Sequence, residues 1–388
     1  MNILFVTCAR YPTEKAYGVT VGNTMKSLTK AAISNSVITW GRPMNDNYGN
    51  NIKSIANRPL RVPFKLYNSN IKIVAKLSYI VNQVFFSVYF AKPWRKYPDD
   101  SIFWTREPLT LIVRSILHPR SRFLIDLHHS IGILNKYVIR FLGRNNGLQI
   151  LVLNDELESK YATFFAGKNF INLPMGVPAS FMGLNRKREN DDFVIGYLGK
   201  GFSNGHDNEL SEIVYVAKKL EHIPNLKFKF VGLEVKYREK LRQLIVELGI
   251  GPNKIIFVDH LQHSDIPQEL LKFDVGIVPY PESFYNSERF PIKILEYAAI
   301  GIPIIASDTK SNRNLLNTSF ATFYQKGNQL DLSNSIVGLL RDPLKYAVMA
   351  EKARAFSLKF TYDERVGKLL DSLSKNSWNE EKNLEKDL

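Results

Sequence analysis

The chain has 388 residues, and at roughly 100–200 residues per domain this length predicts two domains. With 45% hydrophobic and 12% aromatic residues, the chain can bury two ordinary cores, which excludes a disordered composition. The single cysteine, Cys8, excludes an intramolecular disulfide, and the first residues lack the basic flank of a signal peptide. We therefore expect a cytoplasmic protein. Its formal net charge of +15 indicates an anionic partner, such as nucleic acid, an acidic membrane face or a phosphorylated substrate.

Short β-rich segments alternate with helical patterns from the N-terminus onward. In the first half, strands are expected at 2–7, 36–40, 101–105, 122–126, 148–153 and 170–173. Helical patterns such as 20–32 and 109–117 lie between them. This alternation predicts a parallel sheet with crossover helices. We expect a Rossmann-like α/β domain over residues 1–182.

Residues 51–98 carry much of the positive charge. They contain nine Lys or Arg, nine aromatic residues and no Asp or Glu. The longest uncharged run, 77–91, has 15 residues and includes Asn82 and Gln83. A transmembrane helix needs about 20 predominantly apolar residues, so we expect no span here. A core helix with solvated basic ends and a helix lying on an anionic membrane surface both remain open, and nucleic-acid contact is the weaker alternative.

The second half repeats the alternation after a polar linker at 183–192. Strands are expected at 193–198, 227–231, 254–258, 275–279 and 303–306, and helices at 208–220, 236–248, 266–272 and 291–300. A second Rossmann-like domain is therefore expected over 193–358, followed by a helix at 359–373 and a polar tail at 374–388. Ligands of such sheets bind at the carboxyl ends of the strands, so the cleft between two such domains is the expected site.

The stretch "SERFPIKILEYAAIGIPIIAS", residues 287–307, carries the most informative pattern. Glu288 lies in a loop before a helix, and Glu296 lies on the helix itself. Pro291 suits a first helical position, and the free N–H groups of this helix start, at Phe290 and Ile292, favour a phosphate. Carboxylates accept hydrogen bonds from hydroxyl groups. One glutamate could thus hold a hexose and the other a ribose, on either side of a diphosphate.

Glu288 and Glu296, with seven residues between them and "YAAIGIPIIAS" at the second, resemble the signature of family 4 retaining glycosyltransferases of the GT-B fold. The resemblance extends to "FWTREPLT", "FLIDLHHS", "NLPMGVP", "FVIGYLGKG" and "FTYDERVGKLLDSL", and so covers most of the chain. It implies two Rossmann-like domains facing across a cleft, with the helix at 359–373 returning to the first domain. It also implies transfer of a sugar from a nucleotide sugar to a saccharide or lipid-linked saccharide, with retention and without a metal or other cofactor.

The resemblance also implies roles for individual residues. Glu288 would hold the hydroxyls of the transferred sugar, Glu296 would hold the ribose, and His128 would contact the sugar or the incoming hydroxyl. Lys200 would stabilise the charge on the departing diphosphate; Arg289 stands where many members have Gly, and we expect it to replace the charge missing at Asn204. The donor-binding set then comprises Glu296, Arg289, Phe290, Ile292, Gly18 and Gly199.

The chain departs from the family pattern at several of these places. Lys200 stands where the family has Arg, and Asn204 where it has Lys, which weakens the phosphate contacts. Asp126 replaces a glutamate in the Glu-x-His strand end, and the paired glycines of the first loop are reduced to Gly18. His128 and its neighbour His129 are expected on a strand, pointing apart, so we expect no metal site.

Other functions fit the sequence less well. "GKGFSNG" is one residue too long for a dinucleotide fingerprint, and Ser203 lies about four residues past its strand, too far for a nucleophile elbow. A nucleotide-sugar epimerase of the same fold would need no acceptor. A basic nucleic-acid-binding protein would explain the charge but not the paired glutamates.

Overall fold

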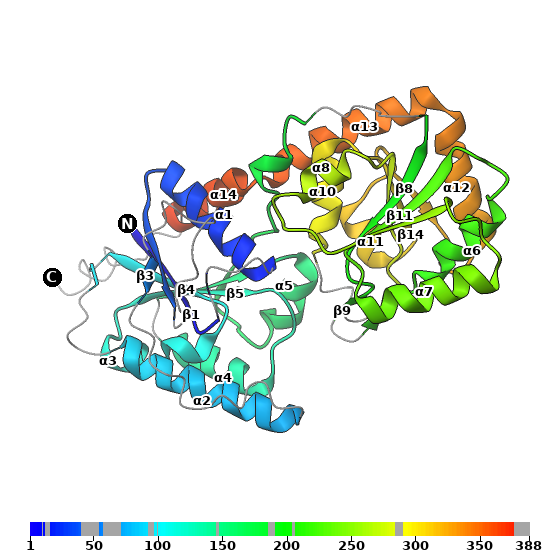
Figure 1. The fold of residues 1–388 in the computed structure, drawn as a ribbon. Coiled ribbons are helices and arrows are strands. Elements are labelled where there is room, and N and C mark those ends of the chain that lie inside the picture. The colour runs from blue at the N-terminus through cyan, green and yellow to red at the C-terminus, as the bar shows by residue number, and fades with distance from the viewer. Residues whose placement is uncertain are drawn as a thin grey trace. The chain divides into compact units, whose positions relative to one another are not determined.

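The computed structural model describes residues 1–9, 11, 16–39, 54–56, 71–91, 97–98, 100–144, 147–184, 191–203, 206–283 and 290–375. The chain divides into two compact units (Figure 1). The first unit combines Met1–Met175 with Tyr362–Leu388, and the second is Gly176–Thr361. Most of the expected linker at 183–192 lies outside the described residues.

The first unit is built on a seven-stranded sheet in the order β3-β2-β1-β4-β5-β6-β7, with every pair parallel. The strands are β1 Asn2–Thr7, β2 Ser34–Thr39, β3 Ser54–Ala56, β4 Ser101–Thr105, β5 Arg122–Leu127, β6 Leu148–Val152 and β7 Asn169–Asn172. The strand order reverses between β1 and β4. In such sheets the crevice at the carboxyl ends of the reversing strands is the usual binding place.

Helices cover both faces of this sheet (Figure 1). On one face lie α1 Ala16–Lys30 and α14 Tyr362–Lys375, where Met25 and Leu28 pack with Val366 and Leu369. On the other lie α2 Lys72–Phe90, the 3₁₀ turn η2 Pro108–Leu111, α3 Ile112–Leu117 and α4 Ile133–Leu142. Helix α5, Asp155–Ala162, connects β6 to β7. The apolar core of this unit therefore combines both ends of the chain.

The second unit has a six-stranded parallel sheet in the order β12-β11-β8-β13-β14-β15. Its strands are β8 Phe193–Leu198, β11 Leu226–Val231, β12 Ile255–Val258, β13 Val275–Val278, β14 Ile304–Ser307 and β15 Ala321–Tyr324. A small antiparallel pair, β9 Phe202–Ser203 and β10 His206–Asp207, follows β8. Here the strand order reverses between β8 and β13, so the loops after these two strands share the expected binding edge.

The helices of the second unit also form two layers (Figure 1). One face carries α6 Ser211–Lys219, α7 Val235–Glu247 and α12 Gln329–Arg341, and the other carries α8 Ile266–Leu270 and α10 Ile292–Ile300. The remaining elements are η3 Ala179–Phe181, α11 Lys310–Leu315, α13 Pro343–Ser357 and η4 Leu358–Phe360. The expected fold class, two doubly wound α/β units, is confirmed.

One local expectation was wrong. Strand β5 ends at Leu127, so His128 and His129 follow the strand rather than lying on it. The helix in the basic stretch also reaches further than its uncharged run. Within α2, the 18-residue window Ile73–Phe90 has a mean hydropathy of 1.4 and is long and apolar enough to cross a membrane by length and composition. Unlike the uncharged run 77–91, this window includes Lys76, and the expectation that the segment does not span a membrane stays a prediction.

Candidate functional site

Tyr297, the residue after Glu296, fixes α10 against the second sheet. Its buried hydroxyl accepts a hydrogen bond of 2.9 Å from the N–H of Leu198, at the end of β8. A Cβ on Gly276 in β13 would lie 2.4 Å from the Tyr297 ring, so only glycine leaves room for it. Because α10 connects the parallel strands β13 and β14, its N-terminus lies at the carboxyl edge of the sheet. The partial positive charge of this helix end therefore lies at the expected binding edge.

A lysine in the first turn of α10 reaches the loop after β8. Gly199 has a φ of 151°, and a Cβ there would lie 2.9 Å from the Nζ of Lys293. The next residue, Lys200, is more exposed than Lys293. The Nζ of Lys200 lies 4.0 Å from a carboxylate oxygen of Glu234. From the sequence, the phosphate charge was expected on Lys200 and Arg289; Lys293 belongs to the same sequence pattern as Glu296 but was given no phosphate role. Its place three residues before Glu296, about one helical turn, was the available signal.

Glu296 is buried in α10, and its nearest recorded partner is a histidine. The Oε1 of Glu296 lies 3.5 Å from the Nε2 of His263, whose ring packs against Phe181 with centroids 5.7 Å apart. Phe290 packs on Phe360 with centroids 5.8 Å apart, and Ile292 begins α10. The structure thus gathers a carboxylate, a lysine and a helix N-terminus on one element.

Glu288, Arg289 and Asn204 lie outside the described residues. The same holds for much of the basic stretch at 51–98, which is described only at 54–56, 71–91 and 97–98. Gly18, the remaining glycine of the first loop pattern, is buried in α1.

In the first unit, His128 is held by a buried carboxylate. The Oδ2 of Asp126 lies 2.9 Å from the Nε2 of His128 and accepts a 3.0 Å hydrogen bond from the Nε of Arg106. Burial, reinforced by the Arg106 charge, lowers the pKa of His128 to about 4, although Asp126 acts in the opposite direction. At neutral pH the imidazole is therefore uncharged. If its Nε2–H donates to Asp126, its Nδ1 is left able to accept a hydrogen bond.

Asp126 also contacts the helix that returns from the C-terminal part of the chain. The Nη2 of Arg365, on α14, lies 3.7 Å from the Oδ2 of Asp126, and Nη1 donates to the carbonyl oxygens of Leu173 and Pro174. Burial acts to raise the pKa of Asp126, but His128 and the guanidinium groups outweigh it and hold this pKa well below its usual range. The carboxylate is therefore charged at neutral pH. Arg365 was not among the site residues expected from the sequence.

A second buried carboxylate joins the ends of β1 and β4. The Oε2 of Glu107 accepts hydrogen bonds from the N–H of Cys8 at 2.6 Å and the hydroxyl of Thr7 at 3.2 Å. Its Oε1 accepts a 2.6 Å hydrogen bond from the hydroxyl of Tyr79, on α2. Burial raises the pKa of Glu107, although these hydrogen bonds act against the shift. Helix α2 is thus tied to the point where the strand order reverses.

Across the described ranges, no three His, Cys, Asp or Glu side chains gather in a way that could hold a metal ion. The groups at the two candidate edges are carboxylates, cations, an imidazole and backbone amides. Such groups recognise hydroxyls and anionic oxygens.

Comparisons with known proteins point to one family. Residues 186–356 match the sequence model of the glycosyl transferases group 1 family. Over 166 residues the chain is 28% identical to a protein of Bacillus subtilis (strain 168), provisionally named the teichuronic acid biosynthesis glycosyltransferase TuaH. This match covers 42% of the chain and 40% of that protein, so it spans less than half of the curated relative.

Solved structures match over nearly the whole chain. A sucrose-phosphate synthase from Thermosynechococcus elongatus is 17% identical with a TM-score of 0.67, covering 97% of this chain and 100% of that one. The Anabaena protein HepE, solved with UDP and glucose, is 16% identical with a TM-score of 0.66 and the same coverage. At these identities the likeness shows the fold, which is that of the GT-B glycosyltransferases.

Proposed function

We propose that this chain is a retaining glycosyltransferase, because residues 186–356 match the sequence model of the glycosyl transferases group 1 family and the chain has the GT-B fold. The enzyme moves a sugar from a nucleotide-sugar donor to a saccharide or lipid-linked saccharide acceptor in cell-surface polysaccharide synthesis. The bound UDP and glucose of HepE and the teichuronic acid assignment of the Bacillus subtilis relative support the donor and acceptor classes.

The arrangement of α10 carries this proposal. Lys293 and the free N–H groups of the helix start suit an anionic diphosphate, and the buried Glu296 suits a pair of ribose hydroxyls. When the bond between the sugar and the diphosphate breaks, negative charge develops on the departing oxygens. Lys200, Lys293 and Arg289 stabilise that charge, which lowers the barrier without a resident metal.

The acceptor side of the proposal rests on His128. Its neutral imidazole is held by Asp126, and the Nδ1 accepts a hydrogen bond from a hydroxyl of the sugar or the acceptor. Glu288 holds hydroxyls of the transferred sugar. The departing phosphate takes the proton of the acceptor hydroxyl, so the new glycosidic bond forms on the face that the nucleotide leaves.

A thermal-shift panel of nucleotide sugars tests the donor class. A ligand at 100 times its dissociation constant adds about 2.7 kcal/mol to the stability of the folded protein, which is readily measured. We expect stabilisation by one or more nucleotide sugars, and none from the free sugars alone. A panel without any stabilising nucleotide or nucleotide sugar would overturn the proposal.

Substitution of the two glutamates then separates their roles. Glu288→Gln should mainly lower turnover, because it contacts the reacting sugar, and Glu296→Gln should mainly weaken nucleotide binding. Glu247→Gln, an exposed carboxylate on α7, is the matched control. The site assignment is wrong if both variants keep the turnover and nucleotide affinity of the control.

A further inference from the structure

Helix α2 presents its apolar side to solvent. The exposed side chains are Ile73, Leu77, Val81, Val84, Phe85 and Val88, of which Ile73 is 71% and Phe85 50% exposed. The positions 73, 77, 81, 84 and 88 recur every three or four residues, so they form one stripe along the helix, which we call the outer face. A surface helix of a soluble domain normally turns such a stripe toward the core.

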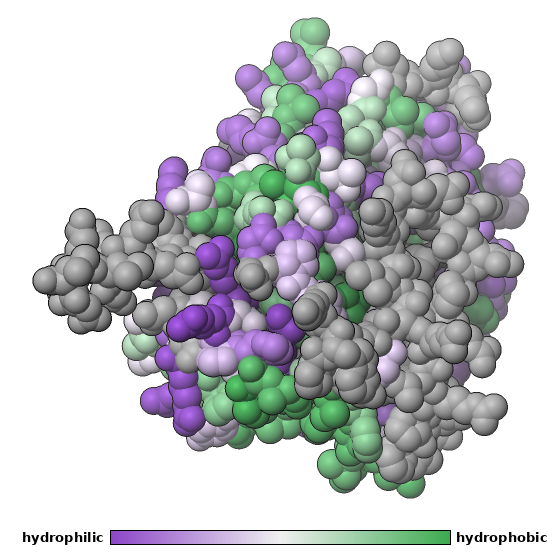
Figure 2. Space-filling view, turned by 90° about the vertical axis from the view of Figure 1, so that its left-hand side faces the viewer, coloured by the Kyte–Doolittle hydropathy of each residue, from purple (hydrophilic) through white to green (hydrophobic). Residues whose placement is uncertain are grey.

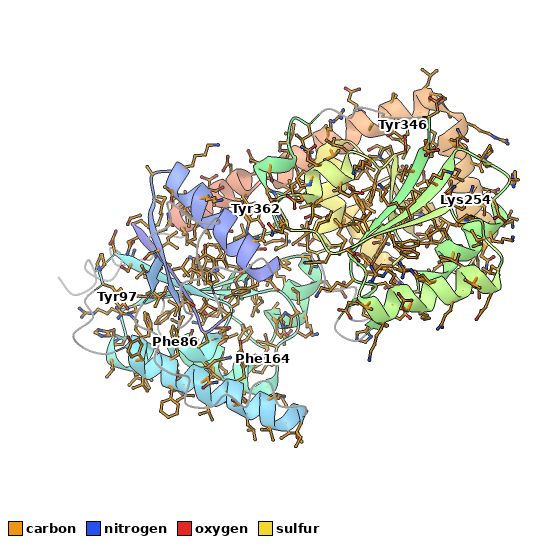
Figure 3. All side chains as sticks on the ribbon, viewed as in Figure 1. Phe86, Tyr97, Phe164, Lys254, Tyr346 and Tyr362 are labelled. Atoms are coloured by element: carbon orange, nitrogen blue, oxygen red, sulfur yellow. The ribbon has the colours of Figure 1, made fainter. Side chains whose placement is uncertain are left out.

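The opposite side of α2 is largely buried and carries polar residues, of which Tyr79 and Ser87 hydrogen-bond to other parts of the fold. Ser78, Asn82, Gln83 and Ser87 are buried there beside Phe86 and Phe90, and Figure 3 labels Phe86 between the helix and the sheet. The Oγ of Ser87 accepts a 3.0 Å hydrogen bond from the N–H of Val113, at the start of α3. The hydroxyl of Tyr79 donates to Glu107. These hydrogen bonds hold α2 in this orientation, so its outer face cannot rotate inward without breaking them.

Neighbouring helices extend the apolar surface. Helix α2 contacts α3, and α3 contacts α4. These helices expose Ile116 and Leu117 on α3, and Ile133, Leu134 and Tyr137 on α4. Figure 2 shows hydrophobic side chains gathered along the lower part of the molecule, at the level where Figure 1 places α2 and α3. Contiguous apolar surface of this kind marks an interaction site.

The segments that form this surface expose mainly positive charge. Among the described residues between 71 and 144, Asp100 is the one exposed acidic residue, and it pairs with the N-terminal amino group at 2.5 Å. Glu107 and Asp126 are buried. The exposed basic residues of the same segments are Lys76, Arg120, Arg140 and Arg144. Each basic residue near an anionic lipid surface contributes about 1 kcal/mol of attraction. A second copy of the chain would instead bring the same positive charge against itself.

We propose that the outer face of α2, with the exposed apolar side chains of α3 and α4, docks on the surface of an anionic lipid bilayer. The helix lies in the membrane plane, because its inner side is held to the fold by Tyr79 and Ser87 and cannot meet lipid. Tyr79 of the docked helix donates a hydrogen bond to Glu107. Glu107 in turn accepts hydrogen bonds from Thr7 and Cys8 at the end of β1. The inference deepens the proposed function, on which it rests, by making the acceptor a membrane-bound, lipid-linked saccharide.

Vesicle sedimentation with the full chain tests the docking. We expect binding to vesicles of phosphatidylcholine with phosphatidylglycerol, weaker binding to phosphatidylcholine alone, and weaker binding at high salt. Phe85→Glu with Val88→Glu should reduce binding to the anionic vesicles by about tenfold or more, because two apolar anchors become charged. The matched controls are Val246→Glu on α7 and Leu344→Glu on α13, two exposed apolar positions of the second unit that should leave binding unchanged.

Three results would overturn the inference. One is equal or negligible sedimentation with both kinds of vesicle, and another is equal loss in the outer-face and control variants. The third is a dimer in sedimentation velocity that Phe85→Glu with Val88→Glu dissociates, because a second copy would then cover the outer face. The nucleotide-sugar thermal shift of the same variants reports the donor site separately. If that shift persists without vesicle binding, docking fails and the transferase proposal stands; vesicle binding without any shift contradicts the transferase proposal instead.

Discussion

His128 should make the stability of the first unit depend on pH. Its side chain is 16% exposed and lies against the carboxylate of Asp126. That carboxylate also contacts the guanidinium groups of Arg106 and Arg365. The pKa is lowered from 6.5 to about 4 in the folded protein. Because the folded pKa lies below the unfolded one, the unfolded chain takes up a proton first as the pH falls. The contribution of His128 to stability is therefore fully present above about pH 6.5 and is lost as the pH falls toward about 4.

The size of this effect follows from the two pKa values. A difference of about 2.5 between them corresponds to about 3 kcal/mol in total, of which about 2 kcal/mol is lost between pH 7 and pH 5. In His128→Gln the side-chain amide can still donate to Asp126 but does not titrate. The loss of stability between pH 7 and pH 5 should therefore be about 2 kcal/mol smaller in this variant than in the wild type.

Tryptophan fluorescence during urea unfolding provides the assay. The four tryptophans, Trp40, Trp94, Trp104 and Trp378, all belong to the first unit by their sequence positions, and Trp104 is buried in its core. The signal therefore follows the first unit alone. The exposed neighbour His129 provides the control His129→Gln. The reasoning is refuted if His128→Gln keeps the pH dependence of the wild type, or if the control loses as much of it.

Three further predictions concern the second unit and the reaction. Lys293→Met should weaken nucleotide-sugar binding by about tenfold in isothermal titration, because it removes the charge beside Gly199, whereas Lys200→Met at a more exposed side chain should cost less; the reverse ranking would contradict the assignment. Tyr297→Phe leaves the N–H of Leu198 unpaired and should lower the unfolding free energy of the second unit by about 1–3 kcal/mol in calorimetry, so an unchanged transition would count against this anchoring role. The enzyme should keep its turnover in EDTA. Activity that is lost in EDTA and restored by Mn²⁺ or Mg²⁺ would show that a metal ion stabilises the departing diphosphate together with the cationic side chains.

The sheets could be predicted because each strand is specified by its own short run of residues. Strands β1, β4 and β8 begin and end where the sequence analysis expected, since apolar runs between turn residues are a local signal. The orientation of α2 could not be predicted in this way. Its apolar stripe is plain in the sequence, but the hydrogen bonds of Tyr79 and Ser87 that turn this stripe outward depend on partners more than 20 residues away.

The residues of the candidate site divide in the same way, into those with a local sequence signal and those whose role depends on distant partners. Glu296 and Gly199 were singled out because they belong to short motifs, whereas Lys293, His263 and Arg365 acquire their importance through contacts between distant elements. Arg365 and Leu173, for example, are 192 positions apart in the chain. No local sequence pattern predicts such a contact. For Lys293 the spacing from Glu296 was a local signal, but its approach to Gly199 is established only when the crossover helix is placed on its sheet.

The return of α14 to the first sheet has a consequence for synthesis on the ribosome. The second unit, Gly176–Thr361, is one continuous segment that can fold while α14 is still being made. The first unit cannot finish until α14 arrives with Val366 and Leu369 for its core and Arg365 for the carboxylate of Asp126. Although its strands emerge first, this unit is completed last. A nascent chain stopped at Thr361 would therefore carry a complete second unit beside a first unit that still exposes the apolar side of α1.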